Sequence, residues 1–230
     1  MAKPVALIVG VGDGLSASLA RLLTRDGYVV ALAARNVAKL AGLAIEIDGH
    51  CYSVDAVDAA QVAALFEALD ADLGPPEVVI YNASGRERGP LINLNPAAVA
   101  QAITVSAFGG FLVAQQAARR MEPLGRGTIL LTGASASVKG YAQSAPFAMG
   151  KFALRGLAQS IARELAPKGI HVAHIVIDGA IRSASRLDPM DRPDSTLDPD
   201  AIGQSYLDLI HQPRNAWTWE IELRPWVETF

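Results

Sequence analysis

Residues 5–34 read VALIVGVGDGLSASLARLLTRDGYVVALAA, and this stretch decides the fold. Two apolar runs rich in valine, residues 5–10 and 29–34, enclose a segment in which leucines recur every three or four positions before Gly27. Apolar runs without polar alternation are typical of strands buried on both faces, whereas the leucine spacing is typical of an amphipathic helix. A strand, a crossover helix and a second strand in this order predict a parallel sheet.

The rest of the chain repeats this pattern. Further apolar runs span residues 77–83, 127–133 and 170–177, and a helical segment follows Asp58. The sequence therefore predicts one α/β domain over residues 1–230, with a doubly wound parallel sheet and helices on both faces, as in the Rossmann fold.

Two segments near the C-terminus depart from the repeat. Residues 182–201 are rich in proline and aspartate and poor in apolar residues, so we expect a long surface loop that acts as a lid over a substrate. Residues 216–226 contain all three tryptophans and predict a C-terminal strand. Large aromatic side chains near one terminus favour a contact surface, so we expect a homo-oligomer.

Composition excludes several classes of protein. The 230 residues are 51% hydrophobic, with a net charge of −3 and basic residues scattered along the chain, which disfavours nucleic acid as a partner. The apolar run near the N-terminus is too short for a secretory signal or a membrane span, so we expect a cytoplasmic protein. The single cysteine, Cys51, is expected at the start of a buried strand and cannot form an internal disulfide.

The glycine-rich turn GVGDGLS, residues 10–16, lies between the first strand and its helix. Gly10, Gly12 and Gly14 allow a sharp bend and a close approach of backbone N–H groups to a pyrophosphate at the helix N-terminus. A plain tight turn is the alternative, but the position after the first strand of an α/β chain favours a nucleotide.

These features make the chain similar to the short-chain dehydrogenase/reductase family. The family's Thr-Gly-x-x-x-Gly-x-Gly turn places Gly10 and Gly14 at matching positions, with Val9 and Ser16 at two positions that differ. The family's Asn-Asn-Ala-Gly resembles YNAS, residues 81–84, which keeps Asn82 and Ala83.

The resemblance implies a nicotinamide dinucleotide held at these turns. Asp55, after the third strand, matches the aspartate that contacts the adenine amino group. The family's Pro-Gly turn matches Asp178-Gly179 only with one extra residue in the preceding strand, which makes Ile181 the expected neighbour of the nicotinamide.

The end of the second strand indicates which dinucleotide binds. An acidic residue there would accept the ribose 2′-hydroxyl of NAD, whereas a neutral residue followed by arginine accommodates the 2′-phosphate of NADP. The chain has Ala34 and Arg35 at this place, which favours NADP(H) over NAD(H). Asp13 in the glycine turn opposes this assignment, because its carboxylate would lie near the phosphate.

The family's catalytic residues are only partly present. Its Tyr-x-x-x-Lys pair corresponds to Phe147 and Lys151, and Phe147 has no proton to donate. Thirteen positions before Phe147 lies Ala134, with Ser135 beside it, and Ser106 stands where the family has an asparagine. We therefore expect Lys151 to bind the nicotinamide ribose, with Ser135, Phe147 and Ser106 at the other catalytic positions.

No metal site is expected. His171 and His174 lie three apart on a predicted strand, so they face opposite sides of the sheet and cannot share a metal ion. Asp178 follows the same strand, where a turn-forming role is favoured over that of a base.

Two hypotheses of different classes follow. The chain is an NAD(P)-dependent oxidoreductase acting on a small carbonyl or alcohol, with the proton supplied by water, Ser135, Tyr141 or the substrate in place of the tyrosine. Alternatively, it is an NAD(P)-binding pseudoenzyme that acts as a sensor or partner subunit, because Lys151, Asp55 and Asn82 would suffice to hold the dinucleotide.

Overall fold

The computed structural model describes residues 3–183 and 186–228 and contains one seven-stranded sheet in the order β3-β2-β1-β4-β5-β6-β7. Every neighbouring pair of strands is parallel. The strands are β1 (Val5–Val9), β2 (Val29–Ala34), β3 (His50–Ser53), β4 (Val78–Tyr81), β5 (Gly127–Thr132), β6 (Ile170–Ile177) and β7 (Glu220–Leu223). The predicted doubly wound parallel sheet is confirmed.

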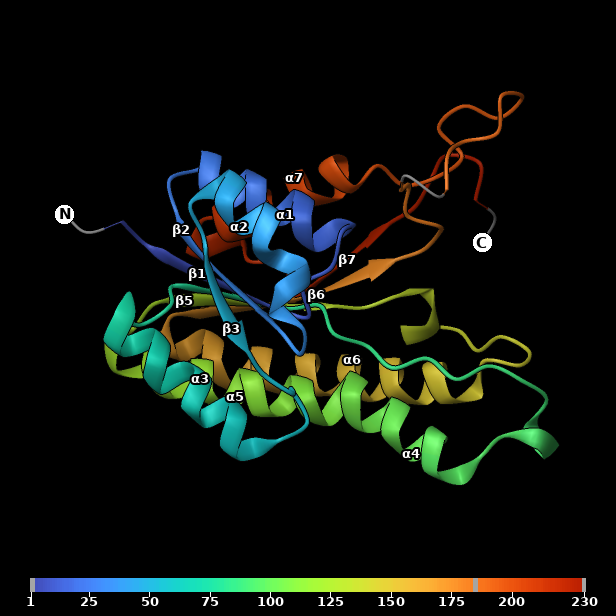
Figure 1. Ribbon diagram of the computed structural model, residues 1–230, viewed down its shortest axis with the longest axis horizontal. Helices are drawn as coiled ribbons and strands as arrows, with labels where there is room; N and C mark the ends of the chain where they lie inside the picture. Colours follow the sequence, from blue (N-terminus) through green and yellow to red (C-terminus); the bar gives the residue numbers. More distant parts are fainter. Residues whose placement is uncertain (1–2, 184–185, 229–230) are drawn as a thin grey trace.

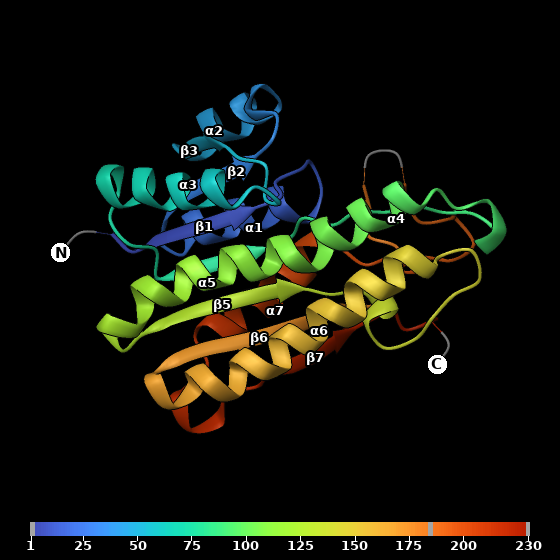
Figure 2. The same cartoon turned by 90° about the horizontal axis from the view of Figure 1, so that it is seen from below.

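Helices cover both faces of the sheet (Figure 1). One face carries α1 (Leu15–Arg25), α2 (Ala41–Ile47) and α7 (Pro199–Ile210). The other face carries α3 (Ala59–Asp72), α4 (Pro96–Ile103), α5 (Gly109–Met121) and α6 (Ala145–Leu165) (Figure 2). Short 3₁₀ turns span Val37–Leu40, Leu91–Asn93, Glu122–Leu124, Ser135–Ser137, Ala166–Lys168 and Arg214–Ala216, and a π-helical turn, Thr104–Phe108, joins α4 to α5.

The strands are apolar on both sides because each side meets a separate layer of helices. Within β1, Val5, Leu7 and Val9 belong to the core shared with α3, α5 and α6, whereas Ala6 and Ile8 belong to the core shared with α1 and α7. All five residues of β1 are buried. This two-sided burial explains why the sequence lacks the polar alternation of a strand with one wet face.

Two boundaries and the exposure of one residue differ from the predictions. The lid segment ends at Asp198, because the Asp198 carboxylate accepts a hydrogen bond from the Asp200 N–H at 2.8 Å and caps α7. The last strand, β7, is shorter than residues 216–226 and ends before Pro225. Cys51 is exposed, not buried, because β3 is an edge strand of the sheet.

Within the described residues, one helical segment, Pro96–Leu124, is long and apolar enough to cross a membrane by length and composition alone. Its α5 portion buries Val113, Ala117 and Met121 in the core formed with the sheet. Packing on the sheet therefore accounts for part of the apolar character of this segment.

Candidate active site

Two adjoining cavities open at the carboxyl ends of the strands, where ligands bind in open α/β sheets. The first, of about 510 Å³, lies among the ends of β1, β2 and β4. The second, of about 690 Å³, lies among the ends of β5 and β6, the start of α6 and the lid segment. Asn82 and Ser84 line both cavities, so a single extended ligand can occupy the two together.

Gly10 brings the turn after β1 against the end of β4. Its φ angle is +90°, and a Cβ atom placed there would lie 2.4 Å from the backbone nitrogen of Ala83. Both the left-handed conformation and the contact with Ala83 therefore require glycine at this position. The backbone N–H of Gly10 donates to the carbonyl oxygen of Ala33 at 2.9 Å, which ties the turn to β2 as well.

A short hydrogen-bond chain fixes the same turn from behind. The Asn82 Nδ2 atom donates to Ser16 Oγ at 2.6 Å, and Ser16 Oγ donates to the carbonyl oxygen of Gly10 at 3.2 Å. Gly14 precedes α1, and its carbonyl oxygen accepts from the N–H of Ala17 at 3.0 Å. Ser16 is buried behind the turn, so it positions the glycines and does not line the cavity.

Lys151 projects from α6 into the second cavity and is only 3% exposed. Its Nζ atom donates to the carbonyl oxygen of Thr132, at the end of β5, at 2.7 Å. Burial lowers the pKa of Lys151 to about 7, and the nearby Arg86 guanidinium contributes in the same direction. A buried amine with one hydrogen bond retains the capacity to donate to a ligand in the cavity.

Phe147 lies one helical turn before Lys151 and also lines the second cavity. The Lys151 Nζ atom is 5.9 Å from the centre of the Phe147 ring. The Arg86 guanidinium carbon lies 4.3 Å from the same ring centre, so the cation rests on the face of the ring. Ser135 and Tyr141, which both carry hydroxyl groups, line the cavity from the β5–α6 connection.

A family model described as short chain dehydrogenase matches residues 4–186. The chain belongs to the short chain dehydrogenase family.

Relatives from other organisms agree with this assignment. The L-2,3-butanediol dehydrogenase of Corynebacterium glutamicum is 27% identical over 218 residues, which cover 88% of this chain and 81% of the relative. A solved short-chain dehydrogenase from Rhodopseudomonas palustris is 35% identical, with a TM-score of 0.85 over 97% of this chain and 99% of that one. A metagenomic short-chain oxidoreductase solved in complex with NADP is 27% identical, with a TM-score of 0.85 over 98% of both chains.

The residues of this short chain dehydrogenase fit a nicotinamide dinucleotide. Gly10 and Gly12, which have no side chains, and Ala83, which has only a methyl group, line the first cavity, so backbone is accessible there to a pyrophosphate. A Cβ atom added to Gly12 would meet nothing within 4 Å, so the turn is open on its cavity side. In the second cavity, Ile181 lies with Lys151, where the sequence predicted the nicotinamide end.

The far end of the first cavity contains charges of both signs. Arg35 lines it, as predicted, together with Asp13 and Asp55. The Asp55 carboxylate accepts from the N–H of Val57 at 3.3 Å, which fixes the loop after β3. Lys39 is a second basic residue here that the sequence analysis missed; its position four residues after Arg35, at the start of a helical segment, could have indicated it.

Ser106 does not reach the cavity. It is fully buried in the π-helical turn, where its Oγ atom accepts from the N–H of Gly85 at 3.1 Å. A Cβ atom added to Gly150 of α6 would lie 2.7 Å from the Ser106 Cβ, so the serine is closely packed between two glycines. The structure thus places Ser106 as a packing residue that supports the segment after β4.

Asp178 and the two histidines are held by other parts of the chain. Asp178 is buried at the cavity edge and pairs with Lys139 at 3.4 Å and Arg224 at 3.6 Å. His171 stacks on Trp217 with 4.9 Å between ring centres, whereas His174 Nδ1 lies 3.0 Å from Glu220. Within residues 3–183 and 186–228, no group of three or more potential ligands is arranged for a metal ion.

Proposed function

We propose that this short chain dehydrogenase is an NADP(H)-dependent oxidoreductase that acts on a small carbonyl or alcohol without the usual tyrosine general acid. The observation that supports the proposal is the buried Lys151 in a cavity that adjoins the glycine-turn cavity. Burying a lysine this deeply lowers the stability of the folded protein. A residue kept at such a cost is a candidate for ligand binding.

The proposed roles follow from where the side chains lie. Gly10 and the start of α1 would receive the pyrophosphate, and Lys151 would bind hydroxyl groups of the nicotinamide ribose. When bound, the dinucleotide supplies or accepts the hydride. Ser135 and Tyr141 are the hydroxyls placed to hold the substrate oxygen or to pass its proton, because both line the cavity beside Phe147.

Preference for NADP(H) rests on Arg35 and Lys39. Both are exposed at the end of the first cavity, where they could pair with a 2′-phosphate. Asp13 lies at the same end and opposes this preference. Arg35 and Lys39 share the cavity with two carboxylates, Asp13 and Asp55, so the preference rests on the place of Arg35 directly after β2. A metagenomic short-chain oxidoreductase similar to this chain was solved with NADP.

Fluorescence titration of the purified protein with NADPH and NADH tests this proposal. We expect NADPH to bind about tenfold more tightly than NADH, since an exposed charge-assisted contact to a phosphate contributes on this scale. Arg35→Ala should remove most of the difference and leave NADH binding unchanged. Arg25→Ala, at the far end of α1, is the matched control. Absence of binding by either nucleotide would refute the proposed function.

The pseudoenzyme is the second candidate, and Phe147 favours it. The ring has no proton to transfer, and Arg86 covers one of its faces. This candidate predicts the same nucleotide binding as the oxidoreductase but no turnover with any carbonyl. The Phe147→Tyr variant described below distinguishes the two.

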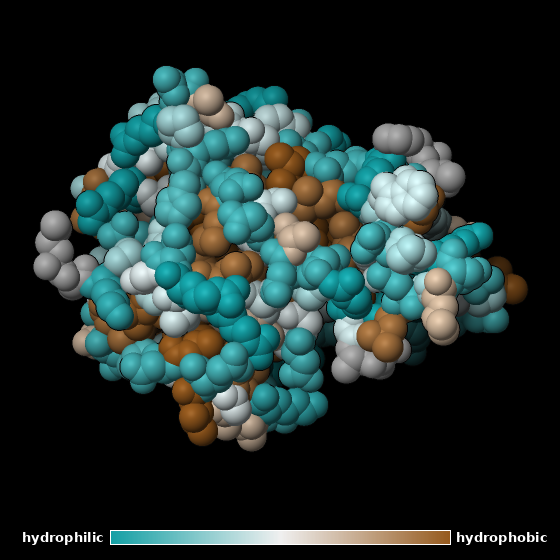
Figure 3. Space-filling view, turned by 90° about the horizontal axis from the view of Figure 1, so that it is seen from above, coloured by the Kyte–Doolittle hydropathy of each residue, from teal (hydrophilic) through white to brown (hydrophobic). Residues whose placement is uncertain are grey.

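We further propose that the chain forms a homo-oligomer through α4, α5 and α6 on one face, where α4 and α5 run end to end and α6 lies beside them (Figure 2). Four large apolar side chains are exposed on α5, α6 and the turn before α5, namely Phe108, Phe111, Met149 and Phe152. Phe108 and Phe111 stack with 6.0 Å between ring centres. On the opposite face, hydrophilic side chains cover much of the surface (Figure 3). The cytoplasmic location stays a prediction of the sequence.

Sedimentation velocity tests the oligomer. We expect a dimer or tetramer at micromolar concentration, and a shift towards monomer in the Phe108→Ser/Phe152→Ser double variant, because apolar area buried between copies supplies most of the affinity. The control is Ile45→Ser, a more exposed apolar residue on α2 across the sheet. A wild-type protein that sediments as a monomer at all concentrations would contradict the proposal.

A further inference from the structure

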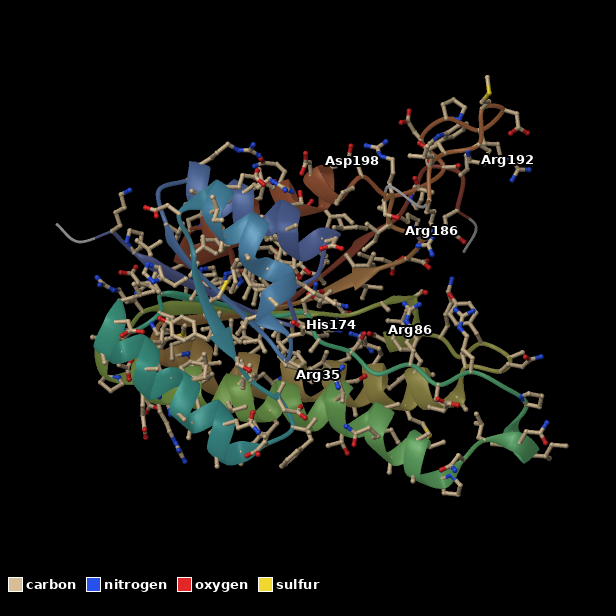
Figure 4. All side chains as sticks on the ribbon, in the orientation of Figure 1. Arg35, Arg86, His174, Arg186, Arg192 and Asp198 are labelled. Atoms are coloured by element: carbon tan, nitrogen blue, oxygen red, sulfur yellow. The ribbon has the colours of Figure 1, made fainter. Side chains whose placement is uncertain are left out.

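Three arginines gather at the second cavity from two distant parts of the chain. Arg86 and Arg88 come from the segment after β4, and Arg186 comes from the lid segment. In Figure 4, Arg86 and Arg186 lie on either side of the space between the lid and the helices below the sheet. Lys151 adds a fourth basic group to the same cavity wall.

Few carboxylates oppose these cations. Within the described parts of the chain, none of Arg86, Arg88 and Arg186 forms an ion pair. The cavity contains two acidic residues, Asp178 and Glu228. Asp178 already forms ion pairs with Lys139 and Arg224. Glu228 is therefore the acidic residue of the cavity that is left to oppose the three arginines.

The arginines repel one another in the free protein. Burial lowers the pKa of the Arg86 guanidinium, and the positive charges of Arg88 and Arg186 lower it further. Gathering like charges has an electrostatic cost, which an anion bound among them would offset. The dinucleotide phosphates are not that anion, because none of the three arginines lines the first cavity.

Arg86 is also held in a defined orientation. Its guanidinium carbon lies over the Phe147 ring, 4.3 Å from the ring centre. The planar fork of an arginine held against an aromatic ring is well suited to bind a carboxylate or phosphate. A side chain already fixed in place loses less conformational entropy when the ligand binds. Phe147 thus serves as the platform for Arg86.

We propose that the substrate of this enzyme carries a carboxylate or phosphate group that Arg86, Arg88 and Arg186 bind. This inference rests on the proposed function, since it takes the second cavity as the substrate site beside the dinucleotide. It narrows the substrate class from small carbonyls and alcohols in general to anionic ones.

Calorimetric titration with matched carbonyl compounds, with and without saturating NADPH, tests the inference. One pair is 4-oxopentanoate and its methyl ester, and the other is dihydroxyacetone phosphate and dihydroxyacetone. In at least one pair we expect the anion to bind about tenfold or more tightly than its neutral partner, the scale of a charge-assisted hydrogen bond. The pair that shows the difference distinguishes a carboxylate from a phosphate.

Variants assign the preference to the arginines. Arg86→Gln and Arg186→Gln should each lose most of the preference for the anion, and Arg86→Lys should retain part of it because the charge remains without the planar fork. Arg192→Gln is the control, since Arg192 is exposed on the same lid segment and does not line the cavity (Figure 4). The Arg192→Gln variant should prefer the anion over its neutral partner as strongly as the wild type does.

Equal affinity for both members of both pairs would overturn the inference. A preference that survives in Arg86→Gln and Arg186→Gln would overturn it too, because the anion would then bind elsewhere. The titration without NADPH shows whether the arginines bind the anion even if the protein binds no dinucleotide. Failure of the anion site and failure of the proposed oxidoreductase function are therefore separate results.

Discussion

Phe147→Tyr should raise the rate of NADPH-dependent carbonyl reduction by about 10²- to 10⁴-fold, the usual contribution of a positioned general acid. The new phenol would stand on α6 one turn before Lys151, on the same helical face and inside the second cavity. The Lys151 Nζ atom is already 5.9 Å from the ring centre. The phenol would therefore stand in the cavity near the lysine that is kept from the family's Tyr-x-x-x-Lys pair.

The surroundings would also adjust the acidity of that phenol. Positive charge favours the phenolate, so the Arg86 guanidinium should lower the tyrosine pKa below its ordinary value. An acid whose pKa is closer to neutrality transfers its proton more effectively at physiological pH. The pH profile of kcat/KM in the variant should therefore show an ionisation that the wild type lacks.

Steady-state NADPH oxidation with a panel of anionic and neutral carbonyls measures the effect. Phe152→Tyr is the matched control, because Phe152 lies next to Lys151 on the exposed side of α6 and does not line the cavity. Activity that appears only in Phe147→Tyr would mark the wild type as a dinucleotide-binding protein without turnover. Equal rates in wild type and variant would show that another group, such as Ser135 or Tyr141, already transfers the proton.

Much of the fold could be predicted because its signals are local. Each central strand is an uninterrupted apolar run, and β1 is buried at all five positions by helices on both faces. Gly10 could be predicted as a tight-turn glycine from its place directly after the first strand, and its left-handed backbone and contact with Ala83 leave no room for a side chain. Lys151 could be singled out because it keeps the lysine position of the family's Tyr-x-x-x-Lys pair, four residues after Phe147.

Other features depend on contacts between segments that are distant in the sequence. Local sequence patterns do not predict such contacts. Arg86 and Arg186 are 100 positions apart and meet only because the lid folds towards the end of β4. Ser106 sits at the predicted helix position, yet packing against Gly85 and Gly150 turns it away from the cavity. Cys51 is exposed because β3 ends the sheet, and strand order is a property of the whole chain.

The sequence pattern near the C-terminus does not distinguish a long strand from a short strand preceded by packed aromatic side chains. Trp217 and Trp219 read as part of a long strand, but Trp217 stacks on His171 and Trp219 lies 5.6 Å from the Arg155 guanidinium. Aromatic side chains suit a strand surface and an intrachain packing site equally well. Two of the three tryptophans thus contact side chains of their own chain, and Trp226 is the one that is strongly exposed.

Lys151→Met should remove a strong pH dependence of stability from the protein without bound nucleotide. Burial lowers the pKa of Lys151 in the folded state to about 7, whereas its ordinary value is 10.5. Between these two values the unfolded chain holds a proton that the folded chain has lost. The free energy of unfolding therefore rises with pH in this window, by at most about 1.4 kcal/mol per pH unit. Below pH 7 both states hold the proton, and the wild type carries the full cost of a buried charge.

Chemical denaturation of both proteins at several pH values between 7.5 and 9.5 measures the effect. The difference between wild type and Lys151→Met isolates Lys151, because other shifted groups, such as Cys51 and Tyr28, are common to both proteins. His174 does not interfere, since burial lowers its pKa to about 4. Lys39→Met, at an exposed lysine, is the control and should follow the wild-type curve.

Parallel curves for wild type and Lys151→Met would mean that Lys151 titrates alike in the folded and unfolded states, and hence that its amine is hydrated. A lysine in water needs no ligand to offset its burial, and the main observation behind the proposed nucleotide site would then be lost. A slope present in the wild type and absent from the variant would show that the fold maintains a buried amine at a cost in stability. Such a cost at the junction of two cavities is expected of a residue retained to bind a ligand.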